Sequence, residues 1–194
     1  TRTMELIATA RFKKAMDRAS QASAYTRKIG EIVSDLARST GDSEISHPLL
    51  KTPEHTRNTT LLVLTSNRGL AGGYNPNVLR RAEELKALLR EQGKEPVLYV
   101  IGRKGVNFYK FRQRPIAQSW SGFSERPEYA NAAEAGHGLV PAFLAGTEYA
   151  EDDAAPLGTG NGEVLNADEI HIVYTEFRSM LTQTAVAQRL APIE

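Results

Sequence analysis

A glycine-rich turn is the segment of this sequence whose residue types most clearly suggest chemistry. The residues SNRGLAGGYN follow a continuous apolar run and precede a helix-forming run, an arrangement in which many proteins bind phosphate at the helix start. The dinucleotide fingerprint Gly-x-Gly-x-x-Gly does not fit the spacing of Gly69, Gly72 and Gly73, and the Lys-Ser or Lys-Thr pair of a P-loop does not follow. We therefore interpret Arg68, Gly69, Gly72 and Gly73 as a tight structural turn, with phosphate binding as the alternative.

A second turn, VIGRKG, places two basic residues, Arg103 and Lys104, directly after another apolar run. A solvated basic turn is the simpler interpretation, although such residues can also meet an acidic partner surface. The aromatic residues that follow could stack on nucleobases, but Val106, Phe108 and Phe111 fit one apolar face of a helix. We therefore expect that face to lie in the core.

The rest of the sequence suggests no catalytic or metal site. Four histidines fall in separate predicted elements, and none is three or four residues from another: His47, His55, His137 and His171. No pair of carboxylates stands out as an acid/base couple, and the absence of cysteine excludes disulfides and thiolate metal ligands. A histidine on a predicted strand, as at position 171, is best explained as a hydrogen-bonded residue at the edge of the core. The residues thus favour a scaffold without an active site, a cofactor or a metal.

Composition places the chain among ordinary globular proteins. Of its 194 residues, 41% are hydrophobic and 24% are charged, and the net charge of +1 gives no general case for binding nucleic acid or a membrane. No apolar run approaches the roughly 20 residues that span a bilayer. The sequence starts at Thr1 in helix-compatible residues, without the pattern of a signal peptide. We expect it to start within a larger protein.

Residues 1–40 are predicted to form one long helix with a narrow apolar stripe. The segment from position 4 to 38 has no proline, and apolar or small residues recur every three or four positions: Met4, Ala8, Phe12, Ala15, Ala19, Ala22, Tyr25, Ile29, Ile32 and Leu36. Such a stripe is typical of a coiled-coil strand, and a surface helix lying along its own domain is the alternative. No other segment has a matching length, so we expect the partner helix to come from outside this sequence.

Residues 41–60 are predicted to form a linker, and residues 61–194 a Rossmann-like α/β domain. The segments TLLVLTS, EPVLYVIG, RPIAQSW and ADEIHIVYTEF read as strands, and LTQTAVAQRLAPIE as a final extended segment. Helical patterns separate them, which predicts a mostly parallel sheet with crossover helices. In these helices we expect Asn75 to be an N-cap and Gly93 to end the first helix. We expect the last helix to be broken, with a kink or restart at Pro141.

An acidic stretch interrupts this domain at residues 147–167. Between positions 148 and 169 there is no lysine or arginine, and the acidic residues are Glu148, Glu151, Asp152, Asp153, Glu163, Asp168 and Glu169. Glycine alternates with small polar residues there, so little apolar area is available to offset the entropy of ordering. We predict an exposed, mobile loop that is either a plain linker or a regulatory contact.

Four segments together resemble the gamma subunits of rotary ATP synthases. They are TRTMELIATARFKKAM, TSNRGLAGGYN, VIGRKGVNFY and VYTEFRSM, in the order and spacing of that family and over nearly the whole chain. The acidic stretch resembles the insertion of actinobacterial members. Two residues depart from the usual family loop Ser-Asp-Arg-Gly-Leu-Cys-Gly: Asn67 replaces the aspartate and Ala71 the cysteine. Both changes suit a structural loop, and they put in doubt any contact that depends on the aspartate's charge.

The resemblance implies a non-catalytic central shaft. In the family, N-terminal and C-terminal helices form an antiparallel coiled coil inside the catalytic ring, above a Rossmann-like foot without a nucleotide site. The implied partners are the catalytic and nucleotide-binding subunits of the head, the epsilon subunit and the membrane c-ring, on the cytoplasmic side of the cell membrane. This chain would then be truncated at both ends. The implied contact residues are Met4, Ala8, Arg11, Phe12, Ala15, Arg18, Ala22, Ile29 and Leu36.

Two other functions remain as alternatives at this point. One is a Rossmann-type nucleotide-binding enzyme with a helical appendage. The other is a nucleic-acid-binding module built on the long helix. Residues 4–38 contain seven basic and four acidic residues, a balance of +3, and few aromatic residues, which disfavours nucleic acid.

Overall fold

The computed structural model of the chain describes residues 2–39, 49, 56–148, 167–179 and 181–193. By their internal contacts the residues separate into two compact units, Thr1–Ser46 and His47–Glu194. Most of the predicted linker and nearly all of the acidic stretch lie outside the described residues. The fold is α/β, as the sequence predicts.

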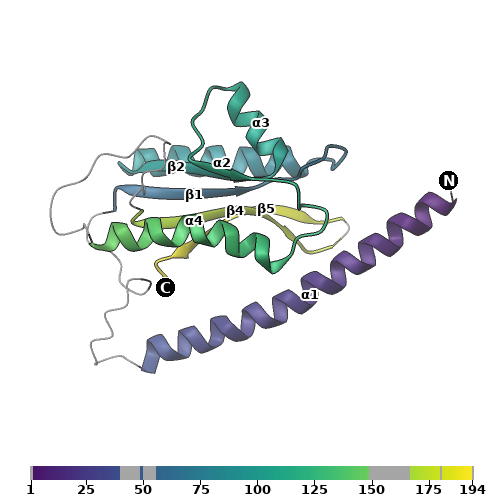
Figure 1. The fold of residues 1–194 in the computed structure, drawn as a ribbon, viewed down its shortest axis with the longest axis horizontal. Helices are drawn as coiled ribbons and strands as arrows, with labels where there is room; N and C mark the ends of the chain where they lie inside the picture. The colour runs from purple at the N-terminus through teal and green to yellow at the C-terminus, as the bar shows by residue number, and fades with distance from the viewer. Residues whose placement is uncertain (1, 40–48, 50–55, 149–166, 180, 194) are drawn as a thin grey trace. The chain divides into compact units, whose positions relative to one another are not determined.

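The first unit is a single helix, α1, which spans Arg2–Ser39 without a break (Figure 1). Its 38 residues correspond to a length of about 57 Å. No proline or helix-capping glycine interrupts it, and a glycine at position 30 is accommodated inside it. Nearly all of its described side chains are exposed, including the large apolar side chain of Met4, which is 72% exposed.

The second unit is built on a five-stranded sheet in the order β3-β2-β1-β4-β5. The strands are β1 (Asn58–Leu64), β2 (Glu95–Ile101), β3 (Gln118–Trp120), β4 (Glu169–Phe177) and β5 (Gln183–Ala191). The first four run parallel to one another, and β5 pairs antiparallel with β4 at the edge. The continuous apolar run of β1 is explained by its central position, because both of its faces are covered.

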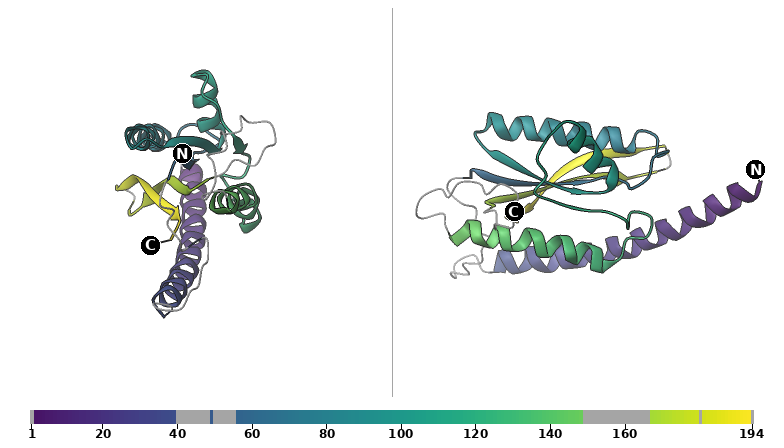
Figure 2. Two further views of the ribbon diagram at one scale, coloured as in Figure 1. Left: turned by 90° about the vertical axis from the view of Figure 1, so that its left-hand side faces the viewer. Right: turned by 45° about the horizontal axis from the view of Figure 1, so that its top comes forward.

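Helices cover the two faces of the sheet (Figures 1 and 2). On one face, α2 (Tyr74–Glu91) and α3 (Arg103–Phe111) pack over a core that includes Leu61, Val63, Val78 and Tyr109. On the other face, α4 (Tyr129–Glu148) packs over a second core that includes Leu62, Trp120, Leu139 and Phe143. Alternate residues of β1 therefore point into different cores.

Two local predictions are wrong. Pro141 does not break the last helix: α4 is continuous around it, and its neighbours Ala142 and Phe143 are buried, so packing against the sheet holds the helix together. Asn75 is not a cap, because α2 begins at Tyr74 with Gly73 at its N-cap. The Asn75 side chain instead accepts a hydrogen bond from the Ser66 backbone N–H at 2.9 Å.

Candidate functional site

The predicted contact stripe of α1 is exposed along the described part of the helix. Side chains at all but one of its predicted contact positions are exposed: Met4, Ala8, Arg11, Phe12, Ala15, Arg18, Ala22 and Ile29. The side chain of Leu36 lies outside the described part of the structure. At about 100° per residue, Arg11 and Arg18 lie on one flank of the stripe formed by Ala8, Phe12 and Ala15. The helix thus presents an apolar seam with basic residues beside it.

The glycine-rich turn lies at the carboxyl edge of the sheet, between β1 and α2. Gly72 has a positive φ of 53°, the left-handed conformation that glycine adopts at little cost. Leu70 also has a positive φ, of 58°, and its side chain is fully exposed. Gly69 lies beside the Lys104 side chain, and Gly73 provides the N-cap of α2. Arg68 is exposed and forms an ion pair with Glu125.

The second turn, after β2, is packed more tightly than the first. Gly102 has a φ of 99°, and a Cβ atom placed on it would lie 2.2 Å from the carbonyl oxygen of Thr65. The Thr65 hydroxyl donates to the Ile101 carbonyl at 2.8 Å and accepts from the Gly105 N–H at 2.9 Å. The expectation of a solvated basic turn is therefore only partly right: the glycines are buried, and Arg103 and Lys104 are exposed.

The first N–H groups of α3 already have acceptors within the protein. Arg103 N–H donates to the Asn67 side-chain oxygen at 3.1 Å, and Lys104 N–H donates to the Ser66 carbonyl at 3.0 Å. Gly105 and Val106 N–H donate to Thr65 and Gly102. A phosphate at a helix N-terminus needs such groups free. The α3 N-terminus consequently leaves none of these four N–H groups for an anion.

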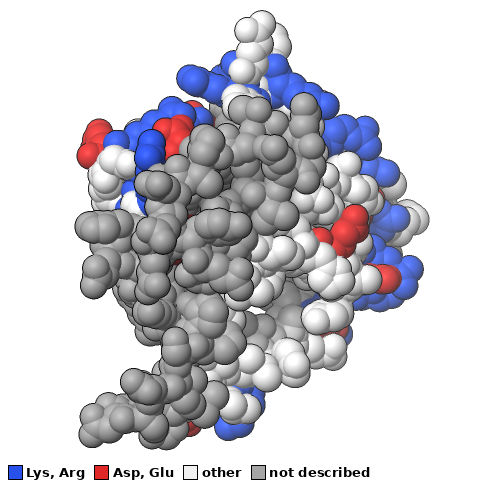
Figure 3. Space-filling view, turned by 60° about the vertical axis from the view of Figure 1, so that its left-hand side comes forward, with Lys and Arg blue, Asp and Glu red and all other residues white. Residues whose placement is uncertain are grey.

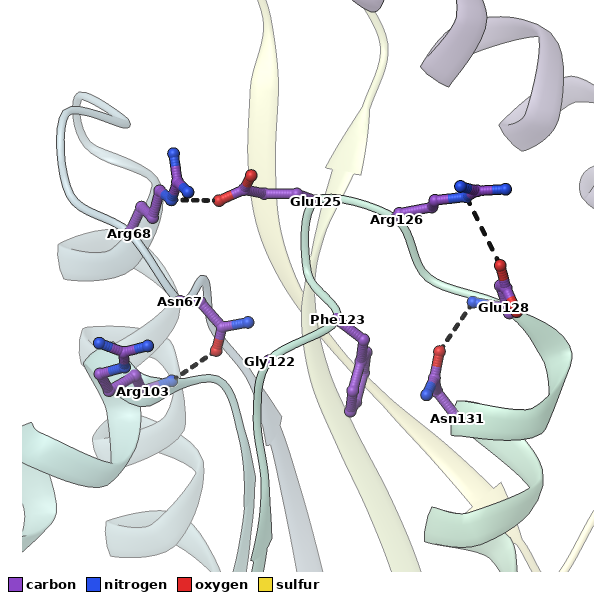
Figure 4. Close-up of a pocket in the computed structure, with 9 residues that line it drawn as sticks. All are labelled: Asn67, Arg68, Arg103, Gly122, Phe123, Glu125, Arg126, Glu128 and Asn131. Carbon is purple, nitrogen blue, oxygen red and sulfur yellow. Dashed lines mark hydrogen bonds and ion pairs between the residues drawn. The ribbon is translucent and has the colours of Figure 1, made fainter.

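A hollow of about 410 Å³ opens at the same edge of the sheet (Figure 4). Its lining is polar and charged, and comprises Asn67, Arg68, Arg103, Gly122, Phe123, Glu125, Arg126, Glu128 and Asn131. Arg68 pairs with Glu125, and Arg126 lies 3.5 Å from Glu128. The Asn67 N–H donates to Ser124 at 2.9 Å, which ties the loop before α4 to the glycine-rich turn. Most of the polar groups thus hold loops together, and no nucleophile with an adjacent base lies among them.

A buried charge cluster lies at the start of β4. Glu169 is 4% exposed, and its carboxylate lies 2.8 Å from Lys94 Nζ, 3.1 Å from His171 Nε2 and 3.8 Å from Arg189. Burial raises the pKa of Glu169, but hydrogen bonds from His171 and Lys94 and their charges outweigh it, so the pKa is lowered to about 2. The carboxylate is therefore held in its charged form. His171 is, as predicted, a hydrogen-bonded residue at the edge of the core.

This cluster corrects part of the prediction for the acidic stretch. Asp168 and Glu169 are buried structural residues and do not belong to an exposed acidic surface. The Asp168 carboxylate accepts the backbone N–H groups of Arg57 and Asn58 at 2.8 and 2.7 Å. Sequence counting missed this because it treats every acidic residue of a polar stretch as solvated. The remaining acidic residues of the stretch lie outside the described residues or have no described side chain.

Phe111 is a further correction, because its side chain is 86% exposed and does not join the core. Within α3, Gly105 and Tyr109 are the buried positions, and Val106 and Phe108 pack against the core from its margin. Among the described residues, no group of three or more His, Asp or Glu side chains is arranged to hold a metal ion. No helix in the described part of the chain is long and apolar enough to cross a membrane.

Comparison with known proteins identifies close relatives. A family described as ATP synthase matches residues 1–194. The ATP synthase gamma chain of Mycobacterium sp. (strain KMS) is 52% identical over 193 residues, which cover 100% of this chain and 60% of that protein. The gamma chain of Mycolicibacterium smegmatis is 52% identical over 194 residues and is covered to 61%. This chain thus spans about 60% of the length of these relatives.

One solved structure shows the same fold. It is the central stalk and c-ring of the Tetrahymena thermophila mitochondrial ATP synthase, with a TM-score of 0.50 and 19% sequence identity. The match covers 84% of this chain and 67% of that one.

Proposed function

This chain belongs to the ATP synthase family, and on that premise we propose that it is a non-catalytic part of the central rotor. As a gamma chain it transmits torque between a proton-driven membrane ring and the catalytic subunits during ATP synthesis. The proposal draws on the roughly half-identical gamma chains and on the fold shared with a central stalk. In this proposal the chain has no active site of its own.

The observation that carries the proposal is α1. A helix of 38 residues with exposed apolar residues at three- and four-residue spacing needs a partner helix to bury them. Its seam contacts are Met4, Ala8, Phe12, Ala15, Ala22, Ile29 and Leu36. Arg11 and Arg18, on the flank of the seam, contact acidic surfaces of the catalytic ring. Residues 1–40 then form the shaft. The foot begins with β1 at Asn58, three residues before the predicted end of the linker at residue 60.

The partners follow from this placement. The shaft contacts the catalytic and nucleotide-binding subunits of the head, and the foot contacts the epsilon subunit and the c-ring. The chain is then peripheral to the cell membrane on its cytoplasmic side. Arg68, Gly69, Gly72 and Gly73 act as a structural turn in the foot, a role supported by the positive φ of Gly72 and by Gly73 at the N-cap of α2.

The experiment uses the absence of cysteine from this chain. Arg18→Cys in the full-length subunit of the assembled enzyme, with any other cysteine of that subunit replaced, provides one site for a disulfide to a cysteine introduced into a ring subunit. Oxidation is expected to stop ATP hydrolysis, and reduction to restore it, because a locked shaft cannot turn. Ala15→Cys, in the seam proposed to face the partner helix, is the matched control and should cross-link to the ring less readily.

Full hydrolysis in a completely cross-linked enzyme would contradict the rotor proposal. A titration of the purified chain with ATP and NAD tests the enzyme alternative, because saturable binding is expected only if the foot is a nucleotide site.

A further inference from the structure

We infer that the outward face of α3 is a docking surface for an acidic, amphipathic segment of another protein subunit. This goes beyond the rotor proposal, which assigns no task to α3. Residues 103–114 contain five basic residues and no acidic residue: Arg103, Lys104, Lys110, Arg112 and Arg114. All five side chains are exposed. Figure 3 shows Lys and Arg side chains gathered at the top of the molecule, where α3 lies in Figure 1.

Helical geometry places the exposed residues of α3 on one side. At about 100° per residue, Arg103, Lys104, Asn107, Lys110 and Phe111 fall within roughly a third of the helix circumference. The opposite side carries Gly105 and Tyr109, which are buried against the sheet. We call the five outward residues the α3 basic face. Among the described residues, its three cations have no carboxylate within ion-pair distance, whereas Arg68 and Arg126 nearby each have one.

Phe111 gives the α3 basic face an exposed apolar side chain beside its cations. Its ring is 86% exposed, and helical periodicity places it on the side of α3 that faces away from the buried Gly105 and Tyr109. Exposed aromatic and arginine side chains are the types most enriched at interface hot spots.

An apolar hollow adjoins the α3 basic face, and two of the residues that line it belong to α3. It has a volume of about 350 Å³ and is lined by Asn75, Pro76, Leu79, Arg80, Glu83, Lys104 and Phe108. Its walls come from α2 and α3, whose apolar side chains meet there. An aliphatic side chain of a partner would fit such a hollow, and carboxylates on the same partner would reach Lys104 and Lys110.

The observations favour a protein over other anionic partners. One exposed aromatic ring offers little area for insertion into a lipid surface, and α3 has only nine residues. Stacking of nucleobases would use several aromatic side chains, whereas Phe108 is covered by the guanidinium of Arg112 at 3.7 Å. A carboxylate-bearing helix or loop satisfies both the charge and the hollow.

The test is zero-length carbodiimide cross-linking of the intact ATP synthase, followed by peptide mass spectrometry. This reagent joins a lysine to a carboxylate only at ion-pair distance. Lys104 and Lys110 are expected to link to Asp or Glu residues within one segment of another subunit. The exposed Lys28–Glu31 pair, 3.2 Å apart in α1, is the internal positive control.

A charge-reversal variant checks that the contact depends on this face. Arg103→Glu with Lys110→Glu should lower the yield of the Lys104 cross-link about tenfold, and Phe111→Ala about threefold, because both remove attraction at the interface. Arg81→Glu with Arg90→Glu, on exposed positions of α2, makes the same change in charge and should leave the yield unchanged.

Three outcomes would overturn the inference. They are cross-links from both lysines only to carboxylates of the same chain, no cross-link while the control pair reacts, and equal losses in the two charge-reversal variants. Binding of the purified chain to phosphatidylglycerol vesicles that is lost in Arg103→Glu with Lys110→Glu, in the absence of an intersubunit link, would likewise replace the protein partner by a lipid surface.

Discussion

Among the glycines of the described residues, Gly102 has the closest neighbour to a Cβ placed on it. Its φ of 99° is strained for other residues, and a Cβ would lie 2.2 Å from the Thr65 carbonyl oxygen. Gly102→Ala should lower the free energy of unfolding by about 3 kcal/mol or more, through backbone strain and displacement of β1. Denaturation in urea, followed by circular dichroism, measures the change.

Gly136→Ala is the matched control for that substitution. A Cβ at Gly136, inside α4, would meet no atom within 4 Å. The change should be neutral or stabilising by about 0.5–1 kcal/mol, because alanine loses less backbone entropy in a helix. Equal effects of the two substitutions would show that the close approach at Gly102 does not determine stability.

Asn67 provides an acceptor to the first N–H of α3, at 3.1 Å. Asn67→Leu removes the acceptor and should cost about 1–2 kcal/mol of stability. Asn67→Asp keeps an oxygen at that position and places a negative charge near the helix N-terminus, so it should be neutral or stabilising by up to about 1 kcal/mol. Urea denaturation at neutral pH distinguishes the two, and a stable leucine variant would contradict this role.

Glu169 makes stability depend on acid pH. Its pKa is lowered from 4.5 to about 2 in the folded protein. Its contribution is therefore fully present above pH 4.5 and is lost as the pH falls through about 2. Glu169→Gln should lower the free energy of unfolding by on the order of 3 kcal/mol at neutral pH. The difference from the wild-type chain should shrink below pH 4.5, and a constant difference down to pH 2 would contradict it.

At the scale of the elements, a substitution in α1 should affect the stability of the isolated chain and that of the assembled enzyme differently. Ala15 is exposed in the chain, so Ala15→Leu should change its stability by less than about 0.5 kcal/mol. In the assembled enzyme the same change should overpack the seam and cost about 1–3 kcal/mol. Ala10→Leu, on the other side of the helix, is the control for thermal inactivation of the enzyme. Identical inactivation of the two variants would show that Ala15 does not face a partner helix.

The sequence predicted the elements better than their contacts. Periodicity over long segments located α1, α2 and the four parallel strands, since a buried strand and an amphipathic helix have different spacing of apolar residues. Predictions from the sequence were wrong at positions whose conformation depends on contacts with other elements. Pro141 continues a helix that the sheet supports, Phe111 is turned outward by the burial of Tyr109, and Asn75 bonds across a loop instead of capping.

The glycine turns show the same limit within the candidate site. Failure to match either phosphate fingerprint directed attention to a structural turn, and Gly72 has the positive φ typical of such a turn. The tighter constraint at Gly102 depends on Thr65, which lies 37 residues earlier in the chain. The spacing of residues within the VIGRKG turn does not show that Thr65 lies against it. The role of Thr65 was therefore not predictable from the sequence.

At the scale of the whole molecule, the acidic stretch is the part most open to change. The residue that follows it is well anchored: Ala167 N–H donates to the Ala142 carbonyl at 2.9 Å, and Asp168 binds two backbone N–H groups. Replacing residues 150–166 by a Gly-Ser linker of equal length should therefore change the stability of the chain by less than about 1 kcal/mol. We expect it to alter the ratio of ATP synthesis to hydrolysis in the full enzyme.

Membrane vesicles with the replaced enzyme measure synthesis, hydrolysis and proton pumping side by side. A second linker of equal length carries the original acidic residues in shuffled order. It shows whether the charge of the stretch or its particular sequence changes the rates. Unchanged rates in all three assays would leave the stretch as a plain linker.

Because β1 is central in the sheet but early in the sequence, it is synthesised well before one of the two strands that pair with it. Thr59 pairs with Glu169, so β1 leaves the ribosome 169 − 59 = 110 residues before its second neighbour. At about 5–20 residues per second, one edge of β1 stays unpaired for roughly 5–20 s. During that interval the nascent chain exposes both an open strand edge and the apolar seam of α1. We therefore expect newly made chains to be protected by chaperones or by rapid capture by their assembly partners.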